Sequence, residues 1–570
     1  MNGPGEKTIR IPTMDEPRKL KPLGMLLQEK GIINDAHIQF ALKEQKITKE
    51  LLGEVLERLS FATEMDIVSV LSQQENVPYV DVDELLPEER LLKLFNKKLC
   101  LTNMFLPYTV DEKYVDLAVS NLNDPKIGQL VSRYTGLIPR FYIAEKSKII
   151  NAINKFYYFL ENPIEEAIDS EVKLLSHDTE MARGMENLTR HILHLAVKMR
   201  ATDIHLRPME QTLNVGFRID GVMQSVLALP SSIGRLVSTL KMKADMDIAE
   251  QRIPQDGRFA ESVLSNRYEF RASTEVSPYG ENMVLRVLPV GRSFLGLKEL
   301  GFFDEDIDRV KKMFNEPFGI ILLTGPTGSG KSTTLYAGIR TLNLLEKNVL
   351  TVEDPIEVNM SLLRQTQVNE KAGYTFSNAI RHFLRHDPDV ILVGEIRDSE
   401  TATAAISASS TGHLVLSTLH TNSAIGAIPR LKDLGIKPYM ISDSLIGVVS
   451  QRLIRKICRS CKEEYTPRQW ELDYLKDPAI EKLYRGKGCN LCNHSGYFGR
   501  TLVYEFLSID SEMSLMIESE DNLNRISDKA RENGFQDIFD ITARKTKMGI
   551  TSIEEAIRVI GSLKQVYKKL

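Results

Sequence analysis

Residues 325–332, GPTGSGKS, match the phosphate-binding pattern G-x4-G-K-[ST] and constrain the fold more than any other part of the chain. An apolar run typical of a strand, 319–323, precedes them, and a helical stretch, 332–342, follows. Glycines let backbone N–H groups turn inward around phosphate oxygens, and the lysine adds a positive charge. A chance glycine-rich turn would lack this strand and helix. The residues expected to bind the nucleotide are Gly325, Thr327, Gly328, Ser329, Gly330, Lys331, Ser332 and Thr333, with Ser332 also holding Mg²⁺.

Short apolar runs surround this loop and alternate with helical stretches. They read FGIILLTG, NVLTVED, DVILVGEI and HLVLSTLH, in that order after Gly301. Runs of this length are typical of parallel strands that are buried on both faces of a sheet. We therefore expect an α/β fold with a RecA-like P-loop NTPase core.

Two of these runs end in carboxylates that should lie beside the nucleotide. The segment TVEDPIE at 351–357 places Glu353 at a strand end, and DVILVGE ends in Glu395. Gly394 stands where many P-loop enzymes have an aspartate that organises magnesium, so we expect Glu395 to orient or deprotonate the attacking water. The alternative is that Glu395 caps the helix beginning near 398–400. Glu353 is the second carboxylate expected to act in catalysis.

A third junction between strand and loop carries a histidine. It reads TGHLVLSTLHTN at 411–422 and ends close to His420. A histidine there could sense the γ-phosphate and move with hydrolysis. A lone histidine can equally be a structural group whose hydrogen bonds are satisfied, and spacing alone leaves both interpretations open.

Four of the five cysteines form two C-x-x-C pairs near the C-terminus. This pattern suits one structural Zn²⁺ held by four thiolates, which leaves no open position for water. Disulfides are rare in cytosolic enzymes, and the doubled pattern disfavours a chance cluster of buried thiols. The expected zinc ligands are Cys458, Cys461, Cys489 and Cys492.

Composition excludes several classes of protein. The 570 residues carry 73 Lys and Arg against 77 Asp and Glu, for a formal net charge of −4, so the balance gives no indication of a nucleic-acid partner. No apolar run approaches the roughly 18 residues that span a bilayer, and the N-terminus is too polar for a secretion signal. We expect a cytoplasmic protein without direct membrane insertion.

The N-terminal third contains an internal repeat. Residues 22–45 align with 51–74, and each copy has the apolar spacing of a helical pair that packs on its twin. The expected organisation is a flexible tail at 1–20, a helical repeat domain at 21–77, a small α/β domain at 78–158, a linker at 159–186, a second N-terminal, PAS-like α/β domain at 187–292, an ATPase domain with the zinc site at 300–505 and a C-terminal helical subdomain at 506–570.

Together these motifs resemble the secretion ATPase family that drives type II secretion and type IV pilus assembly. The P-loop, TVEDPIE, VGEIRD and TGHLVLSTLHTN follow in the family's order, and ATDIHLRP, RIDG and DIAEQRIPQDGRF match its second N-terminal domain. The resemblance implies a homohexamer that hydrolyses ATP bound between this domain and the ATPase domain. It also implies that Arg271 and Arg286 neutralise the γ-phosphate in the manner of an arginine finger. Without the family resemblance, either arginine could be a salt-bridged surface residue.

Within the family, the chain's length and two N-terminal segments favour a motor for type IV pilus assembly, with type II secretion as the alternative. The resemblance implies an inner-membrane platform protein as partner, and a cytoplasmic alignment-complex protein as a further candidate, so the motor would lie peripherally at the inner membrane. A nucleic-acid translocase shares the RecA-like core, but the acidic charge argues against it. A regulatory module without turnover would need a degraded P-loop, whereas Lys331 and Ser332 are intact.

The N-terminal repeat resembles the cyclic-di-GMP-binding repeat of some family members. That motif commonly begins Arg-Leu-Gly, and its arginine is expected to stack on a guanine. This chain has Pro22 and Leu51 at the two positions, so stacking by those arginines is lost. We therefore favour a helical docking module over a dinucleotide site.

Overall fold

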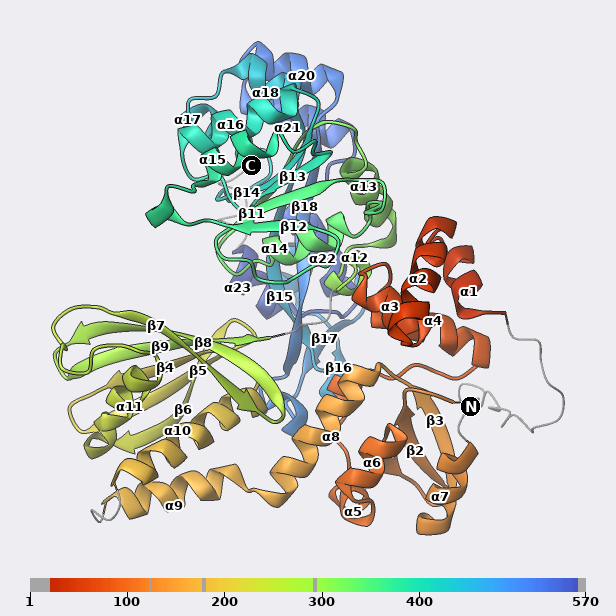
Figure 1. The fold of residues 1–570 in the computed structure, drawn as a ribbon, viewed down its shortest axis with the longest axis vertical. Helices are drawn as coiled ribbons and strands as arrows, with labels where there is room; N and C mark the ends of the chain where they lie inside the picture. Colours follow the sequence, from red (N-terminus) through yellow and green to blue (C-terminus); the bar gives the residue numbers. More distant parts are fainter. Residues whose placement is uncertain (1–20, 123–124, 177–180, 291–294, 562–570) are drawn as a thin grey trace.

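A computed structural model describes four stretches of the chain. Figure 1 shows the P-loop domain at the top, an antiparallel sheet of β4 to β9 at lower left and a small α/β domain at lower right. The expected flexible tail at 1–20 lies outside the described residues. Within the described part, no helix has the length and hydropathy that crossing a membrane requires. The described stretches are 21–122, 125–176, 181–290 and 295–561.

Seven strands form the sheet that carries the P-loop, in the order β12-β11-β13-β14-β10-β15-β18. The strands from β12 to β15 run parallel, and β18 pairs with β15 in the antiparallel sense. This arrangement confirms the expected α/β fold with its parallel sheet. The strands are β10 Gly319–Thr324, β11 Val349–Glu353, β12 Arg364–Gln367, β13 Val390–Val393, β14 Leu414–Leu419, β15 Leu445–Ile457 and β18 Tyr497–Ser508.

Both faces of this sheet are buried, as the apolar runs predict. Ile320 and Leu322 of β10 belong to one hydrophobic core, whereas Ile321 and Leu323 belong to another. Successive side chains on a strand point to opposite faces, so β10 contributes to both layers. The first core is covered by α15 Phe376–Phe383, α16 Ser399–Ser410, α17 Ala427–Asp433 and α18 Pro438–Ser444, and the second by α12 Leu297–Leu300, α13 Asp304–Phe314 and α14 Lys331–Ile339.

The C-terminal helices pack on the same sheet. Met513 and Ile526 join the first core, and Ile541 joins the second. β18 runs to Ser508, so the helices begin a few residues after the expected boundary at 506. They are α20 Ser511–Glu518, α21 Leu523–Glu532, α22 Ile538–Lys547 and α23 Ile553–Ile560.

Six antiparallel strands form a second sheet in the order β6-β5-β4-β9-β8-β7. Long helices pack against it, and their shared core includes Leu188 of α10, Leu236 of α11 and Phe270 of β8. The elements are α10 Met181–Lys198, β4 Ala201–Pro208, β5 Thr212–Ile219, β6 Val222–Pro230, α11 Arg235–Lys243, β7 Asp256–Val263, β8 Asn266–Ser277 and β9 Gly280–Pro289.

The segment expected as a linker at 159–186 is not a linker. Most of it is helical, because α8 (Lys146–Glu161) runs into it and α9 (Ile164–Ser176) fills its centre. Ile164 and Ile168 of α9 are fully buried in the core of the second sheet. The acidic residues that suggested a linker lie between these apolar positions, as an amphipathic helix requires.

The N-terminal third forms two packed units. In the repeat, α1 packs on α4 and α2 on α3. Gly24 faces Leu52 of the other copy and Gly53 faces Leu23, so the two copies make reciprocal contacts. The helices are α1 Leu23–Glu29, α2 Asp35–Thr48, α3 Leu52–Arg58 and α4 Glu64–Glu75. The α/β unit contains α5 Glu89–Leu94, α6 Lys97–Asn103, β1 Phe105–Val110, β2 Tyr114–Val119, α7 Pro125–Thr135, β3 Ile138–Ile143 and α8.

Candidate functional site

The P-loop connects the end of β10 to the start of α14. Gly325, Gly328 and Gly330 have φ angles of 136°, 76° and 88°, which glycine adopts without strain. A Cβ on Gly325 would lie 2.3 Å from the carbonyl oxygen of Gln451, so the loop also leaves no room for a side chain there. The backbone thus has the turn that phosphate binding by N–H groups requires.

Lys331 folds back over this loop. Its Nζ donates to the carbonyl oxygens of Gly325 at 3.0 Å and Pro326 at 3.4 Å. Burial lowers the pKa of Lys331, and the negative charge of Glu395 opposes that shift. The lysine therefore sits at the loop, near enough to Glu395 for the two charges to interact.

Glu395 follows β13 and is held from two sides. His420, directly after β14, lies with Nε2 3.3 Å from Glu395 Oε2, and Arg397 forms an ion pair with Oε1. Burial favours the neutral carboxyl, but the hydrogen bond and charge of Arg397, together with His420, outweigh it and lower the pKa of Glu395. Asp398, rather than Glu395, caps α16, because its Oδ1 accepts the N–H of Thr401 at 2.7 Å.

Glu353 is buried at the end of β11 and has partners on both oxygens. Tyr336 of α14 donates to Oε2, while Thr351 and Gln365 donate to Oε1 at 2.6 and 3.1 Å. These bonds join the P-loop helix to two strands. The structure therefore places Glu353 as an anchor of α14, with its side chain turned into the protein.

Arg271 and Arg286 lie directly opposite each other on β8 and β9. Register partners share one face of a sheet, and the row continues through further charged residues. Like charges directly across strands are unfavourable unless an anion or a carboxylate compensates them. Asp203 does this in part, with Oδ1 3.2 Å from Nε of Arg286. The full row is Arg258, Arg271, Arg286, Asp203 and Arg218.

The arginine row is not joined to the P-loop of its own chain. Among the described residues, no hydrogen bond or ion pair links Arg271 or Arg286 to residues 325–333, and Figure 1 shows β8 and β9 apart from α14. The Arg286 side chain is 60% exposed. The structure thus brings Lys331, Glu395 and His420 together and leaves the arginines outside this group.

The four cysteines of the C-x-x-C pairs meet at the end of β15, with their sulfurs within 4.8 Å of one another. Sγ–Sγ distances are 3.7 Å for Cys458–Cys489, 3.9 Å for Cys461–Cys492 and 3.7 Å for Cys489–Cys492. A tetrahedral Zn²⁺ with bonds of about 2.3 Å holds its sulfurs about 3.8 Å apart. The residues therefore fit a structural zinc ion.

The segment that carries these cysteines is a meeting point of domains. It includes the hairpin β16 (Lys462–Tyr465) and β17 (Leu483–Gly486), which Figure 1 shows between the ATPase domain and the others. Glu84 of the small α/β domain pairs with Arg459 at 3.1 Å, between the first two cysteines. From the second sheet, Arg200 stacks 3.5 Å above the ring of Phe498.

Sequence patterns missed two residues of this site. Arg397 belongs to VGEIRD, and its spacing of two from Glu395 is the signal that places it at the same strand end. Gln451 is a fully buried amide in β15 whose Nε2 donates to the carbonyl of Ser329 at 2.8 Å. A polar residue inside the apolar run of a strand is the signal that could have identified it.

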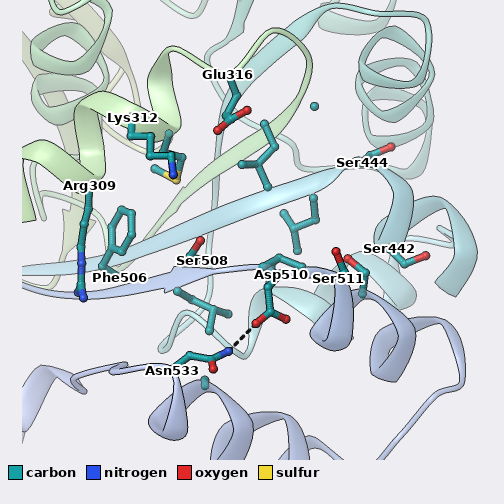
Figure 2. A pocket seen from close by; sticks show the side chains of 18 of the residues that line it. Arg309, Lys312, Glu316, Ser442, Ser444, Phe506, Ser508, Asp510, Ser511 and Asn533 are labelled. Atoms are coloured by element: carbon teal, nitrogen blue, oxygen red, sulfur yellow. Dashed lines mark hydrogen bonds between the residues drawn. The ribbon is translucent and has the colours of Figure 1, made fainter.

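A separate cavity of about 540 Å³ lies between α13, α18, β18 and α20. Figure 2 shows Arg309 and Lys312 on one side and Asp510, bonded to Asn533 at 2.6 Å, on the other. None of the predicted site residues lines it. The residues expected to bind the nucleotide lie elsewhere, on the loop before α14 and in the first turn of that helix.

Residues 178–558 match the family described as Type II/IV secretion system protein, and residues 75–162 match the MshEN domain. The MshEN match thus covers the small α/β domain and begins near the end of the helical repeat. A type II secretion system ATPase E from Vibrio cholerae is 46% identical over 65% of this chain and 74% of its own. The type IV pilus assembly ATPase PilB of Myxococcus xanthus is 33% identical over 94% of this chain and 98% of its own.

A solved structure of the pilus retraction motor PilT with bound ADP covers 66% of this chain and 98% of its own, at 27% identity and a TM-score of 0.45. The family match spans more than half of the chain and includes the P-loop, Glu395 and the cysteine cluster. The chain therefore belongs to the Type II/IV secretion system protein family and is one of its ATPases.

Proposed function

We propose that this ATPase powers type IV pilus assembly as a homohexamer at the cytoplasmic face of the inner membrane, where it acts through a platform protein. One observation carries the choice within the family. The PilB relative aligns over 94% of this chain, which takes in the N-terminal domains as well as the ATPase core. The type II secretion relative aligns over 65% of the chain.

A type II secretion ATPase is the second candidate. It is favoured by the higher identity of 46% over the region that the Vibrio relative covers. Because the ATPase chemistry is common to both, the distinction rests on what the N-terminal domains bind. Deleting the gene tests the choice: loss of surface pili is expected, whereas retained pili with loss of an exported enzyme would favour secretion.

In the proposed reaction, the P-loop N–H groups and Lys331 bind the phosphates of ATP, and the Ser332 hydroxyl would hold Mg²⁺. Bound Mg²⁺ would neutralise charge on the β- and γ-phosphates. Glu395 orients the attacking water. As the water oxygen bonds to the γ-phosphorus, the bond from that phosphorus to the ADP oxygen breaks and phosphate leaves. The lowered pKa of Glu395 keeps it ionised, which suits it to accept a hydrogen bond from that water.

His420 and Glu353 are assigned supporting roles in this proposal. His420 contacts Oε2 of Glu395 directly after the end of β14. A change at the γ-phosphate that moves Glu395 would therefore also move His420. Glu353 fixes α14 through Tyr336 and thereby holds the helix that begins with Lys331. Both residues would act on the position of groups that contact ATP.

The arginine row supports the proposed hexamer. Arg271 and Arg286 lie apart from their own P-loop, and Arg286 is exposed, so we propose that they reach a γ-phosphate when domains close within a ring. Sedimentation of the purified chain with and without ATP tests this assembly. Monomers under all conditions would contradict it.

A further inference from the structure

Gln451 lies directly beneath the P-loop and contacts it at both ends. It is fully buried on β15, next to β10, where Thr324 pairs with Ser450. Its side-chain Nε2 donates to the Ser329 carbonyl oxygen at 2.8 Å. Its own carbonyl oxygen occupies the space that a side chain on Gly325 would need.

The bond to Ser329 has a geometric consequence for the loop. In a trans peptide, the C=O of one residue and the N–H of the next point in opposite directions. Because Gln451 holds the Ser329 carbonyl toward the sheet, the N–H of Gly330 is turned away from it. Gly330 is the N-cap of α14, so its N–H belongs to the N–H groups at the start of this helix that have no partner within it and can bind phosphate.

Packing alone does not account for a glutamine at this position. Its Oε1 is buried and, among the described residues, has no hydrogen-bond partner, as is also true of Oγ of Ser329 and Oγ1 of Thr324. Buried polar atoms without partners are costly, and an apolar side chain of the same length would avoid part of this cost. Each such atom in a native structure calls for an explanation, and a functional role is one of them.

We propose that Gln451 is a positioning residue that sets the Ser329–Gly330 peptide so that its N–H can bind ATP phosphate. The proposal rests on the nucleotide site proposed above and adds the residue that shapes it. Gln451 does not touch the nucleotide. It acts only through the backbone of the loop.

Gln451→Met keeps the length of the side chain and removes the donor. We expect the KM for ATP to rise about three- to tenfold, because the net effect of one buried hydrogen bond is of that size. The turnover number should fall less, since Lys331 and Glu395 remain. Gln451→Asn keeps an amide that is one methylene too short, and should give an intermediate KM.

Thr501→Val on the neighbouring strand β18 is the matched control. Thr501 is also buried, and the substitution removes a hydroxyl that accepts a hydrogen bond from Lys545 at 3.2 Å. No hydrogen bond joins Thr501 to the P-loop among the described residues. Its KM for ATP should equal that of the wild type even if its melting temperature falls. The same full-length protein is used throughout, with Mg²⁺ and ATP as the probe.

The measurement is the rise in melting temperature on adding Mg²⁺ and ATP, read beside KM and the turnover number. Subtracting the value without nucleotide removes any loss of general stability. A Gln451→Met protein with the wild-type KM and the wild-type rise would overturn the proposal. Absence of any rise in the wild type, with no difference from Lys331→Ala, would instead refute the nucleotide site itself.

Discussion

At the scale of single residues, the proposed reaction depends most on Glu395. Replacing it by Gln keeps the shape but removes the charge that orients water. We expect Glu395→Gln to lower ATP turnover by about 10²–10⁴-fold while ATP still binds. Phosphate release and binding of a fluorescent ATP analogue measure the two properties. Near-normal turnover in this variant would show that another group handles the water.

The ion pair with Arg397 predicts a pH effect. Because the pKa of Glu395 is lowered, this carboxylate stays ionised as the pH falls, and ATP turnover should be lost only below that pKa. Arg397→Ala removes the hydrogen bond and charge that lower the pKa of Glu395 and leaves the opposing effect of burial. The acid limb of the turnover profile should therefore move to higher pH.

The control for this profile is Arg381→Ala, because Arg381 forms an exposed ion pair with Glu400 at 3.1 Å on the nearby helices. Its acid limb should stay in place. An unchanged limb in Arg397→Ala as well would mean that the ion pair with Arg397 does not set the ionisation of Glu395.

The P-loop and cysteine residues could be predicted from sequence because their chemistry is local. The glycines, Lys331 and Ser332 lie within eight consecutive positions, and each cysteine pair has its own spacing. The polar Gln451 is visible inside an apolar run, but its contact with the loop could not be predicted, because that contact joins residues 122 positions apart and depends on β15 lying beside β10. The cap of α16 shows the same limit at short range, since the sequence left open whether Glu395 caps this helix and the structure gives that role to Asp398.

At the scale of elements, the segment that carries the four cysteines joins contacts from several domains, so loss of its metal should lower stability. Removing its metal with a chelator, or Cys458→Ser, should lower the free energy of unfolding by several kcal/mol, since metal binding is part of the folding energy of such sites. Elemental analysis should give one zinc per chain before treatment. Unchanged melting after complete removal of zinc would show that the four sulfurs need no ion.

The helix α9 shows why sequence misplaced a boundary. Its acidic residues are spread between apolar positions, and over a short span this resembles a polar linker. Ile168→Ala should destabilise the second sheet domain by about 2–5 kcal/mol, because Ile168 is fully buried. Leu174→Ala on the same helix is the control, since Leu174 is 56% exposed and should change stability by about 0.5 kcal/mol or less. Equal melting of both variants would restore the linker interpretation.

At the scale of the whole molecule, the helical repeat contacts the far end of the P-loop helix. Arg340, directly after α14, donates to the carbonyl of Ser60 at 3.1 Å, and His37 Nε2 lies 3.1 Å from Asn343 Oδ1. One helix thus begins at the phosphate site and ends at the N-terminal domain. The repeat itself was visible in the sequence, but its position against the ATPase domain depends on contacts about 300 residues apart.

The proposed role of the arginine row also depends on the arrangement of the whole molecule. Arg286 pairs with Asp203 in its own sheet, and in the proposed mechanism movement of a whole domain or a neighbouring subunit brings it to ATP. The long N-terminal region shared with PilB and the separated arginines together support a ring that converts closure into pilus assembly.

Complementation of a deletion strain tests this function most directly, with surface pili counted by electron microscopy. The wild-type gene should restore pili, whereas Glu395→Gln, produced at the same level, should not. Pili in the deletion strain itself, or their full restoration by Glu395→Gln, would contradict the proposal that ATP hydrolysis by this protein drives pilus assembly.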